Sequence, residues 1–461
     1  MIRHTLPFGE TTIAADLPDR TRIVPGSQWQ AGIMPVGDEA TAVREALARP
    51  LGVPRIGELV RPASRVAIAF DDLTVPSHGP IRRLAIEAIL EELAASGVAA
   101  SQVTLVCANA LHRKWTHAEL ASVLGDDLVR RFGNRLICHD AEAAENLVDL
   151  GTTPEGYEVE VHRLVAECDL TVYVNAGFYL GFGGGWKSVC AGLSTWKSIR
   201  WTHTPDGMSM SLHKNRMHAV FDKMGRHLEQ RLGKRVFKIE TVLANSRQIG
   251  HVFAGGVDET RQAALAVLAA AHKPRRAASE PADVVLYGVP AWSPYASFAR
   301  MNPILTLISS GLGYLGGYIE ALGKPGCSVI LATPCPDEWD SQHHPSYREV
   351  WERVLSATRD PYAISERWID EFATRGDYIE RYRNSVAFHP VHAILATHPL
   401  KRLRHAARVF VAGPQEPALP RHLGFEPTGS VEEAIAAAES THGADCSIAC
   451  VEIPTAAAMR N

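Results

Sequence analysis

The feature of this sequence that most constrains its fold is a repeated order of short apolar runs and helices with one apolar face. Residues 65–70 (RVAIAF) form such a run, and residues 81–95 follow it with apolar side chains at helical spacing. An apolar run followed by an amphipathic helix is typical of a strand buried in a parallel sheet. Further strands are expected at residues 103–107, 170–174, 283–287, 328–333, 409–412 and 447–451, and further helices at residues 117–124, 259–272 and 345–357.

The length of the chain indicates more than one domain, because its 461 residues are about three times a typical domain. Residues 273–282 form a polar, proline-flanked stretch between an expected helix and an expected strand, which predicts a linker. The sequence therefore predicts an α/β protein with two domains, residues 1–272 and residues 283–461. Each domain is expected to contain a mostly parallel sheet flanked by helices.

The composition argues against several kinds of partner. The formal net charge is −4 and no stretch is rich in Lys or Arg, so long-range attraction to nucleic acid is not expected. No segment has the roughly 18 uninterrupted apolar residues of a membrane span, and the N-terminal residues lack the apolar core of a signal peptide. We therefore expect a cytoplasmic protein that binds neither nucleic acid nor membrane.

The eight cysteines are scattered and form no CxxC pair, which predicts free, buried thiols. A disulfide framework or a cysteine-type zinc site is not expected. If the chain holds a metal, histidine or an organic cofactor must supply most of its ligands.

The most unusual segment is residues 181–188 (GFGGGWKS), which contains three consecutive glycines. Such a run is entropically costly unless the backbone turns sharply or lies close to another group. Exposed backbone N–H groups beside Lys187 suit a phosphate, although a tight turn with a solvated lysine would also explain the pattern. Trp186 occupies the position where a nucleotide-triphosphatase P-loop requires glycine, so that class is disfavoured.

Polar segments follow three of the expected strands, at residues 71–74, 108–113 and 175–187. Ligands of parallel sheets bind beyond the carboxyl ends of the strands, which makes these segments candidates for a site. His112 could project from the second segment as a general base. His203 lies sixteen positions beyond Lys187, after a helix that could fold it back, although a lone histidine is more often structural than a metal ligand.

In order and spacing, these segments resemble the nickel-pincer-nucleotide lactate racemase family over nearly the whole chain. The resemblance rests on the D-x-T-x-P turn at residues 72–76, the LHR segment at His112, the glycine-rich segment ending at Lys187, and His203 beyond it. Residues 252–256 and 324–326 also look like family segments.

The resemblance implies a nickel-pincer nucleotide (nickel pyridinium-3,5-bisthiocarboxylic acid mononucleotide) that is covalently attached to Lys187 and is loaded with the help of cofactor biosynthesis enzymes. His203 would be the one protein ligand to nickel, and a soft set of sulfur, carbon and imidazole donors suits that metal. His112 matches one of two acid/base histidines. The residues expected to hold the nucleotide are Lys187, Asp72, Thr74, Gly184, Gly185 and His203.

The substrate-facing positions depart from the family pattern. Gly177 stands where the second histidine is expected, with Tyr179 nearby in sequence, and Val75 replaces an arginine that holds the substrate carboxylate. In the C-terminal domain, Ser297 stands at a glutamine position and Arg300 at a lysine position. Arg300 keeps a cation that can hold a carboxylate through two hydrogen bonds.

These observations predict a racemase or epimerase of a 2-hydroxy acid or sugar acid that works by hydride transfer to the tethered cofactor. Residues 1–272 would bind the cofactor, residues 283–461 would contribute to the substrate site, and the active site would lie in the cleft between them. The expected catalytic residues are His112, Lys187 and Arg300. The alternatives are an oxidoreductase with the same cofactor on another hydroxylated substrate, and a non-catalytic nucleotide-binding homologue.

Overall fold

The computed structural model describes residues 1–26, 32–75, 80–178, 183–207, 215–245, 248–271 and 280–460. Contacts between Cα atoms divide the chain into two compact units. The first unit comprises Met1–Gln28, Pro274–Tyr378 and Pro390–Asn461, and the second comprises Trp29–Lys273 and Ile379–His389. The expected linker, residues 273–282, lies mostly outside the described residues.

The two units differ from the predicted domains, residues 1–272 and residues 283–461, in two places. The N-terminal residues, which the sequence analysis grouped with residues 1–272, lie in the first unit because β3 (Thr21–Pro25) pairs in parallel with β16 (Ile448–Glu452). Residues Ile379–His389 lie in the second unit. Each of these two segments is placed by contacts with residues far away in sequence, and local sequence patterns do not reveal such contacts.

The second unit is built on a six-stranded sheet with the order β11-β10-β9-β4-β5-β6. All neighbouring pairs are parallel except β10 and β11, which form an antiparallel edge. Every residue of β4 is buried, as expected for an apolar run covered on both faces. The strands are β4 (Val66–Asp71), β5 (Val103–Ala108), β6 (Leu136–Cys138), β9 (Leu170–Phe178), β10 (Phe237–Asn245) and β11 (Gln248–Gly256), and β7 (Leu147–Thr152) and β8 (Glu158–His162) form a separate hairpin.

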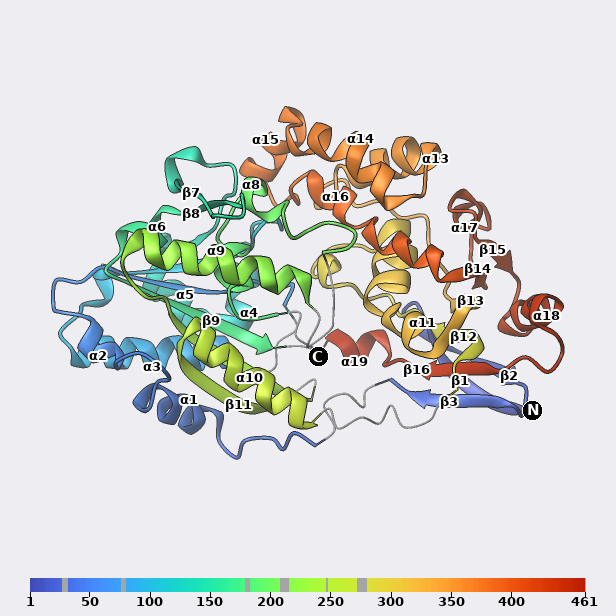
Figure 1. Ribbon diagram of the computed structural model, residues 1–461, viewed down its shortest axis with the longest axis horizontal. Coiled ribbons are helices and arrows are strands. Elements are labelled where there is room, and N and C mark those ends of the chain that lie inside the picture. Colours follow the sequence, from blue (N-terminus) through green and yellow to red (C-terminus); the bar gives the residue numbers. More distant parts are fainter. Residues whose placement is uncertain are drawn as a thin grey trace. The chain divides into compact units, whose positions relative to one another are not determined.

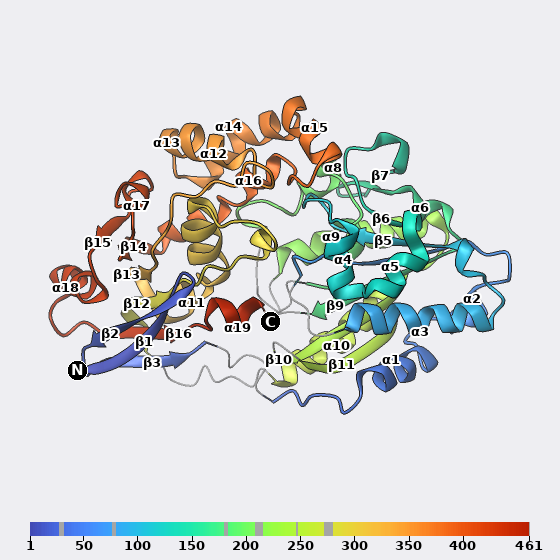
Figure 2. The same cartoon turned by 180° about the vertical axis from the view of Figure 1, so that it is seen from behind.

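Helices cover both faces of this sheet. Helices α9 and α10 lie on the face seen in Figure 1, and α3 and α4 lie on the face seen in Figure 2. Helix α4 begins with a capping box in which Thr116 and Glu119 satisfy each other's backbone N–H groups. The helices are α1 (Glu39–Ala48), α2 (Ile56–Leu59), α3 (Ile81–Ala95), α4 (His117–Leu124), α5 (Asp126–Phe132), α6 (Arg163–Glu167), α7 (Lys187–Cys190), α8 (Trp196–Ile199), α9 (Arg216–Leu232) and α10 (Val257–Ala271), with short turns η2 (Ala100–Gln102), η3 (Gly133–Arg135) and η4 (Ala144–Asn146). Helix α15 (Gly376–Asn384) begins in the first unit and ends in the second.

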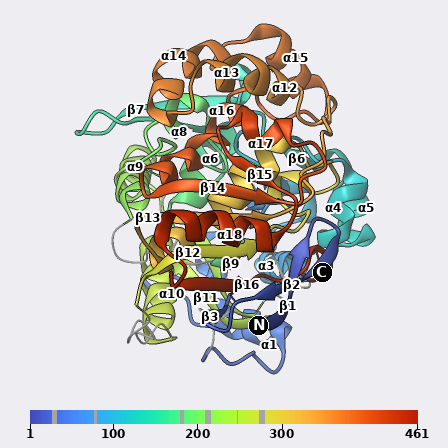
Figure 3. The same cartoon turned by 90° about the vertical axis from the view of Figure 1, so that its right-hand side faces the viewer.

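The first unit contains a six-stranded, wholly parallel sheet with the order β15-β14-β13-β12-β16-β3. Helix α18 crosses one face of this sheet (Figure 3). The other strands are β12 (Ala282–Gly288), β13 (Gly323–Ala332), β14 (Ala406–Ala412), β15 (Glu426–Thr428) and the hairpin of β1 (Ile2–Phe8) and β2 (Thr11–Leu17). The helices are η5 (Pro294–Ala296), η6 (Ile304–Tyr314), α11 (Gly317–Leu322), α12 (Tyr347–Glu349), η7 (Val350–Val354), α13 (Leu355–Ala357), α14 (Pro361–Ala373), α16 (Val391–Leu395), η8 (His398–Arg404), α17 (Ala418–His422), α18 (Val431–His442) and α19 (Ala456–Arg460).

The predicted fold class, two mostly parallel sheets flanked by helices, is confirmed. The helix expected over residues 345–357 contains a π-helical stretch, η7, in its middle. Among the helices that the structure describes, none is both long and apolar enough to span a membrane.

Candidate active site

The carboxyl end of β4 continues into a tight turn that contains Asp72 and Thr74. The Asp72 Oδ1 atom accepts hydrogen bonds from the Thr74 hydroxyl at 2.6 Å and from the Thr74 backbone N–H at 3.2 Å. Arg82, from α3, donates to the backbone carbonyls of Asp71 and Asp72, both at 2.7 Å. All four residues are buried, and Thr74 holds the Asp72 carboxylate while Arg82 holds the backbone that carries it.

His112 lies beyond the end of the neighbouring strand, β5, and faces this turn. Its Nδ1 atom is 3.0 Å from Asp72 Oδ2 and 3.1 Å from the Thr74 hydroxyl, and its side chain is 22% exposed. Because a carboxylate only accepts hydrogen bonds, Asp72 favours the tautomer with a proton on Nδ1. Nε2 is then the nitrogen that can accept a proton.

The Asp72 carboxylate is charged in spite of its burial. Burial alone would raise its pKa, but the charge and hydrogen bond of His112 and the hydrogen bond of Thr74 bring the pKa below its usual range. The Trp115 indole N–H adds a further hydrogen bond to Asp72 Oδ2, at 3.3 Å. Asp72 therefore remains an anion that orients the His112 ring through its Nδ1 atom.

The loop that carries His112 is held by the segment Ile379–His389, whose neighbours in sequence lie in the first unit. The Tyr382 hydroxyl donates to the Ala110 carbonyl at 3.3 Å, and the His389 backbone N–H donates to the Leu111 carbonyl at 3.1 Å. Ala110 has a φ of 50°, an uncommon conformation for a residue other than glycine. These contacts fix a loop whose own backbone is unfavourable.

The glycine-rich segment is described from Gly183 onward, and residues 179–182, including Tyr179, lie outside the described residues. Gly184 and Gly185 have φ values of 72° and 55°, which explains why glycine occupies both positions. Trp186 is buried, packs on α9 where Gly225 leaves no room for a Cβ atom, and donates its indole N–H to Asp258 at 2.9 Å. The helix that follows, α7, has only four residues, so a helix dipole contributes little to an anion site here.

Two charged residues of β10 hold the backbone of this segment from inside the unit. The Gly185 backbone N–H donates to Glu240 Oε2 at 2.9 Å, and Lys238 Nζ donates to the Gly185 carbonyl at 2.7 Å and to the Ser188 hydroxyl at 2.5 Å. Lys238 and Glu240 are fully buried and lie 3.4 Å apart. Lys238 and Glu240 were not predicted as site residues, although two opposite charges two positions apart in a strand point to the same face and are a detectable signal.

Lys187, half-buried, follows directly at the start of α7. Burial lowers the pKa of its ammonium group to about 8. The negative charges of Asp71 and Asp72 raise this pKa, but their effect is smaller than that of burial. The three predicted residues Lys187, Asp72 and His112 are therefore part of one electrostatic neighbourhood at the ends of β4 and β5. With this pKa, roughly a tenth of the Lys187 amine is neutral at pH 7 and can act as a nucleophile.

His203, the predicted nickel ligand, is half-buried and lies just beyond α8. Its Nδ1 atom is 2.9 Å from the Thr202 hydroxyl, and its ring meets Phe221 of α9 edge-on at 6.4 Å between centroids. Within the described part of the chain, no group of three or more His, Cys, Asp or Glu side chains could hold a metal ion.

The four positions that depart from the family pattern are divided between the two units. Val75 is part of the Asp72 turn, where its carbonyl accepts from Arg82 at 3.2 Å, and Gly177 is buried in β9. Ser297 and Arg300 belong to the first unit, after β12. Arg300 is exposed, and its backbone N–H donates to Asp340 at 3.2 Å. The part that Arg300 plays in the site stays a prediction.

The fold and this site define a class: an α/β protein in which a glycine-lysine segment and a histidine-aspartate pair follow parallel strands of one sheet. Residues 8–216 match the family model described as the lactate racemase N-terminal domain. The lactate racemase of Thermoanaerobacterium thermosaccharolyticum is 26% identical to the chain over 393 residues, which cover 81% of the chain and 86% of that protein. The lactate racemase of Lactiplantibacillus plantarum is 27% identical over 274 residues, which cover 56% of the chain and 60% of that protein.

Solved structures show the same fold. The lactate racemase apoprotein from Thermoanaerobacterium thermosaccharolyticum superposes with a TM-score of 0.68 at 21% identity, and the match covers 98% of both chains. A Thermotoga maritima protein matches with a TM-score of 0.55 at 14% identity, over 90% of this chain and 96% of its own. The chain is thus a distant homologue of the lactate racemases over most of its length.

Proposed function

We propose that the chain is a racemase or epimerase of a 2-hydroxy acid or sugar acid, and that it uses a nickel-pincer nucleotide attached to Lys187. The observation that carries the proposal is the pairing of His112 with Asp72 beside a lysine amine whose pKa is lowered to about 8. Proton transfer at a tethered cofactor requires an oriented base, which His112 would provide, and a nucleophilic amine for the tether, which Lys187 would provide.

The residues present fit that cofactor by the chemistry of their donors. Since no cluster of three or more ligating side chains occurs among the described residues, a metal here must bring most of its donors with it. A pincer nucleotide does so and needs one imidazole, for which His203 is the candidate. Lys187 would form the covalent link, and Asp72, Thr74, Gly184 and Gly185 would line the nucleotide site. When bound, the cofactor supplies the hydride acceptor.

The protein's own part in the reaction is proton transfer at His112. Nε2 would take the proton of the substrate hydroxyl, and Asp72 would stabilise the imidazolium that forms. Glu240 and Lys238 would keep the Lys187 backbone in place while this happens. Exclusion of water by the buried turn around Asp72 would strengthen each of these interactions.

The altered positions favour a substrate other than lactate. Val75 presents an apolar side chain where the family has a carboxylate-binding arginine, so one cationic anchor is absent. Arg300 would supply the remaining cation. A larger 2-hydroxy acid, or a sugar acid whose further hydroxyls bind elsewhere, fits that loss better than a three-carbon acid.

A deuterium experiment tests the proposal. The chain, produced together with the cofactor biosynthesis enzymes, is incubated with single enantiomers of 2-hydroxy acids and sugar acids that carry deuterium at C2. The proposal expects inversion at C2 with the deuterium retained, and no reaction with chain produced without those enzymes. Absence of inversion for every acid by fully loaded protein would refute it.

A second candidate function rests on Gly177, which leaves His112 as the one family acid/base histidine in this sequence. A one-directional oxidoreductase needs a single base. It would convert the deuterated substrates into a ketone, with the deuteride passing to the cofactor and the hydroxyl proton to His112, or into an internal redox product. Accumulation of a ketone in the same experiment would favour that function. Tight binding of free nucleotide by metal-free chain, with no turnover, would favour a non-catalytic homologue.

A further inference from the structure

Two cysteines lie opposite each other on neighbouring strands of the second unit. Cys107 of β5 and Cys138 of β6 are register partners in a parallel pair. Neighbouring strands are about 4.8 Å apart, and disulfides span Cα separations of about 4.4 to 6.8 Å. Side chains of register partners in parallel strands point to the same face, so the two sulfur atoms lie on one side of the sheet. β6 has three residues and forms the edge of the sheet, where a strand can shift most easily.

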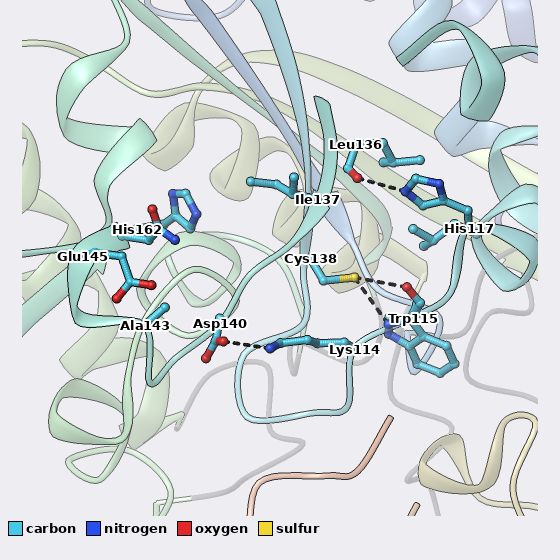
Figure 4. Close-up of a pocket in the computed structure, with 12 residues that line it drawn as sticks. Lys114, Trp115, His117, Leu136, Ile137, Cys138, Asp140, Ala143, Glu145 and His162 are labelled. Carbon is cyan, nitrogen blue, oxygen red and sulfur yellow. Dashed lines mark hydrogen bonds and ion pairs between the residues drawn. The ribbon is translucent and has the colours of Figure 1, made fainter. Parts of the chain in front are cut away.

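The two sulfur atoms differ in environment. Cys107 is fully buried, whereas Cys138 is half-buried and lines a cavity of about 450 Å³ (Figure 4). The Cys138 sulfur also accepts a hydrogen bond from the Trp115 backbone N–H at 3.3 Å. One sulfur is thus open to a small solute, and the other is shielded behind it.

The electrostatics give the two thiols different reactivities. A hydrogen bond from Cys107, together with that of Trp115, lowers the pKa of the Cys138 thiol in spite of its burial. Burial raises the pKa of Cys107 well above its usual range. Because the thiolate is the reactive form, Cys138 is the nucleophile of the pair.

We propose that Cys107 and Cys138 form a dithiol that a peroxide converts into an intramolecular disulfide. The Cys138 thiol first loses its proton, the thiolate attacks hydrogen peroxide, and an S–O bond forms as the O–O bond breaks. Cys138 becomes a sulfenic acid, and the hydroxide that leaves takes up the released proton as water. The Cys107 sulfur then attacks the sulfenic sulfur, an S–S bond forms as the S–O bond breaks, and a second water leaves with the proton of Cys107. Two electrons pass from the sulfur atoms to the peroxide, and a thiol reductant reverses the step.

The oxidation would reach the candidate active site through Trp115. Its backbone N–H and carbonyl both contact the Cys138 sulfur, at 3.3 and 3.5 Å, and its indole donates to the Asp72 carboxylate that holds His112. The disulfide would change the hydrogen bonds between the Cys138 sulfur and the Trp115 backbone. The proposal goes beyond the proposed function and does not depend on it, since the bond forms with or without a cofactor.

Peptide mapping of the peroxide-treated full chain tests the inference. The chain is treated with hydrogen peroxide, alkylated under denaturing conditions and digested. We expect a peptide pair linked through Cys107 and Cys138, which dithiothreitol separates. In Cys107→Ser, dimedone should capture a sulfenic acid on Cys138, whereas the matched control Cys168→Ser should still form the link.

Two other results would overturn the inference. Alkylation of both Cys107 and Cys138 after peroxide treatment would show that the pair is not oxidised. Conversion of Cys138 to a sulfinic acid without a link to Cys107 would show that Cys107 does not resolve it. In untreated native chain, iodoacetamide should modify Cys138 about tenfold faster than buried Cys168, which checks the cavity's role independently of the variants.

Discussion

The Nδ1 atom of His112 lies 3.0 Å from Oδ2 of Asp72, and the Asp72 carboxylate also accepts hydrogen bonds from Thr74 and Trp115. The pair joins the ends of two adjacent parallel strands, β4 and β5. It therefore combines an imidazole that can act as a base with a fixed anion that decides which of the two ring nitrogens is basic.

Replacement of His112 tests its role as general base. His112→Asn should lower turnover of the loaded enzyme by about 10²- to 10⁴-fold, because general acid/base catalysis contributes on that scale. The midpoint of urea unfolding should change little, since His112 is partly exposed. His251→Asn, on the exposed side of β11, is the matched control and should retain activity. Equal losses in the two variants would contradict the role given to His112.

The pKa of Lys187 predicts a distinctive pH profile for acylation. With a pKa of about 8, the amine is roughly 10% neutral at pH 7 and roughly 90% neutral at pH 9. Acetic anhydride should therefore modify Lys187 with a midpoint near pH 8 in chain that lacks cofactor. Lys197, whose pKa is raised by Asp149, is the internal control and should react only at higher pH. Coincident profiles, read by peptide mass spectrometry, would contradict the assignment.

The buried pair of Lys238 and Glu240 predicts a large and non-additive effect on stability. Lys238→Met should lower the free energy of unfolding by about 3 to 5 kcal/mol, because it leaves a buried carboxylate without its cation. Lys238→Met combined with Glu240→Gln should cost less than the sum of the two single changes. Lys197→Met, which breaks a largely exposed pair with Asp149, should cost below about 1 kcal/mol. Additive losses in urea titrations would show that the pair does not act as a unit.

Gly184, in the glycine-rich segment, and Gly233, after α9, both have a positive φ, but replacing them with alanine should cost different amounts of stability. Gly184→Ala should destabilise by about 2 to 4 kcal/mol, because its Cβ atom would add overlap with Phe178 and Glu240 to the strain of a positive φ. Gly233→Ala meets nothing within 4 Å and should cost about 1 kcal/mol from φ alone. Thermal unfolding of the two variants measures the difference, and equal losses would contradict the packing described.

The contact of Tyr382 with the His112 loop predicts a local effect on that loop. Tyr382→Phe removes an oxygen that accepts from the Ala141 N–H at 3.0 Å and should cost about 1 to 3 kcal/mol. Hydrogen exchange of the backbone amides of residues 110–112 should accelerate. In the control Tyr378→Phe, which removes a hydroxyl bonded to Glu349, exchange in that loop should not change. Unaltered exchange in both variants would show that Tyr382 does not hold the loop.

Much of the fold could be predicted because it depends on local pattern. The helices over residues 81–95 and 117–124 begin and end where their apolar spacing indicates. The placing of β3 and of residues 379–389 could not be predicted, because each depends on a partner hundreds of residues away. Single-sequence patterns carry no information on such pairings.

Some residues of the candidate site could be predicted from local sequence, and others could not. The segments that carry Asp72 and His112 are predictable as site candidates because each follows a parallel strand, and the structure places the two side chains in contact. Lys238 and Glu240 were missed because charged residues interrupt the apolar pattern of β10, and no strand was predicted there. Tyr382 was missed because its partner loop is distant in sequence.

The most direct test of the account is the intact mass and nickel content of the chain after production with the cofactor biosynthesis enzymes. The account predicts a nickel-containing adduct on Lys187, equimolar with protein, and no adduct on Lys187→Arg, which keeps the charge but lacks the reactive amine. An unmodified, nickel-free chain, under conditions that load a lactate racemase in parallel, would contradict it.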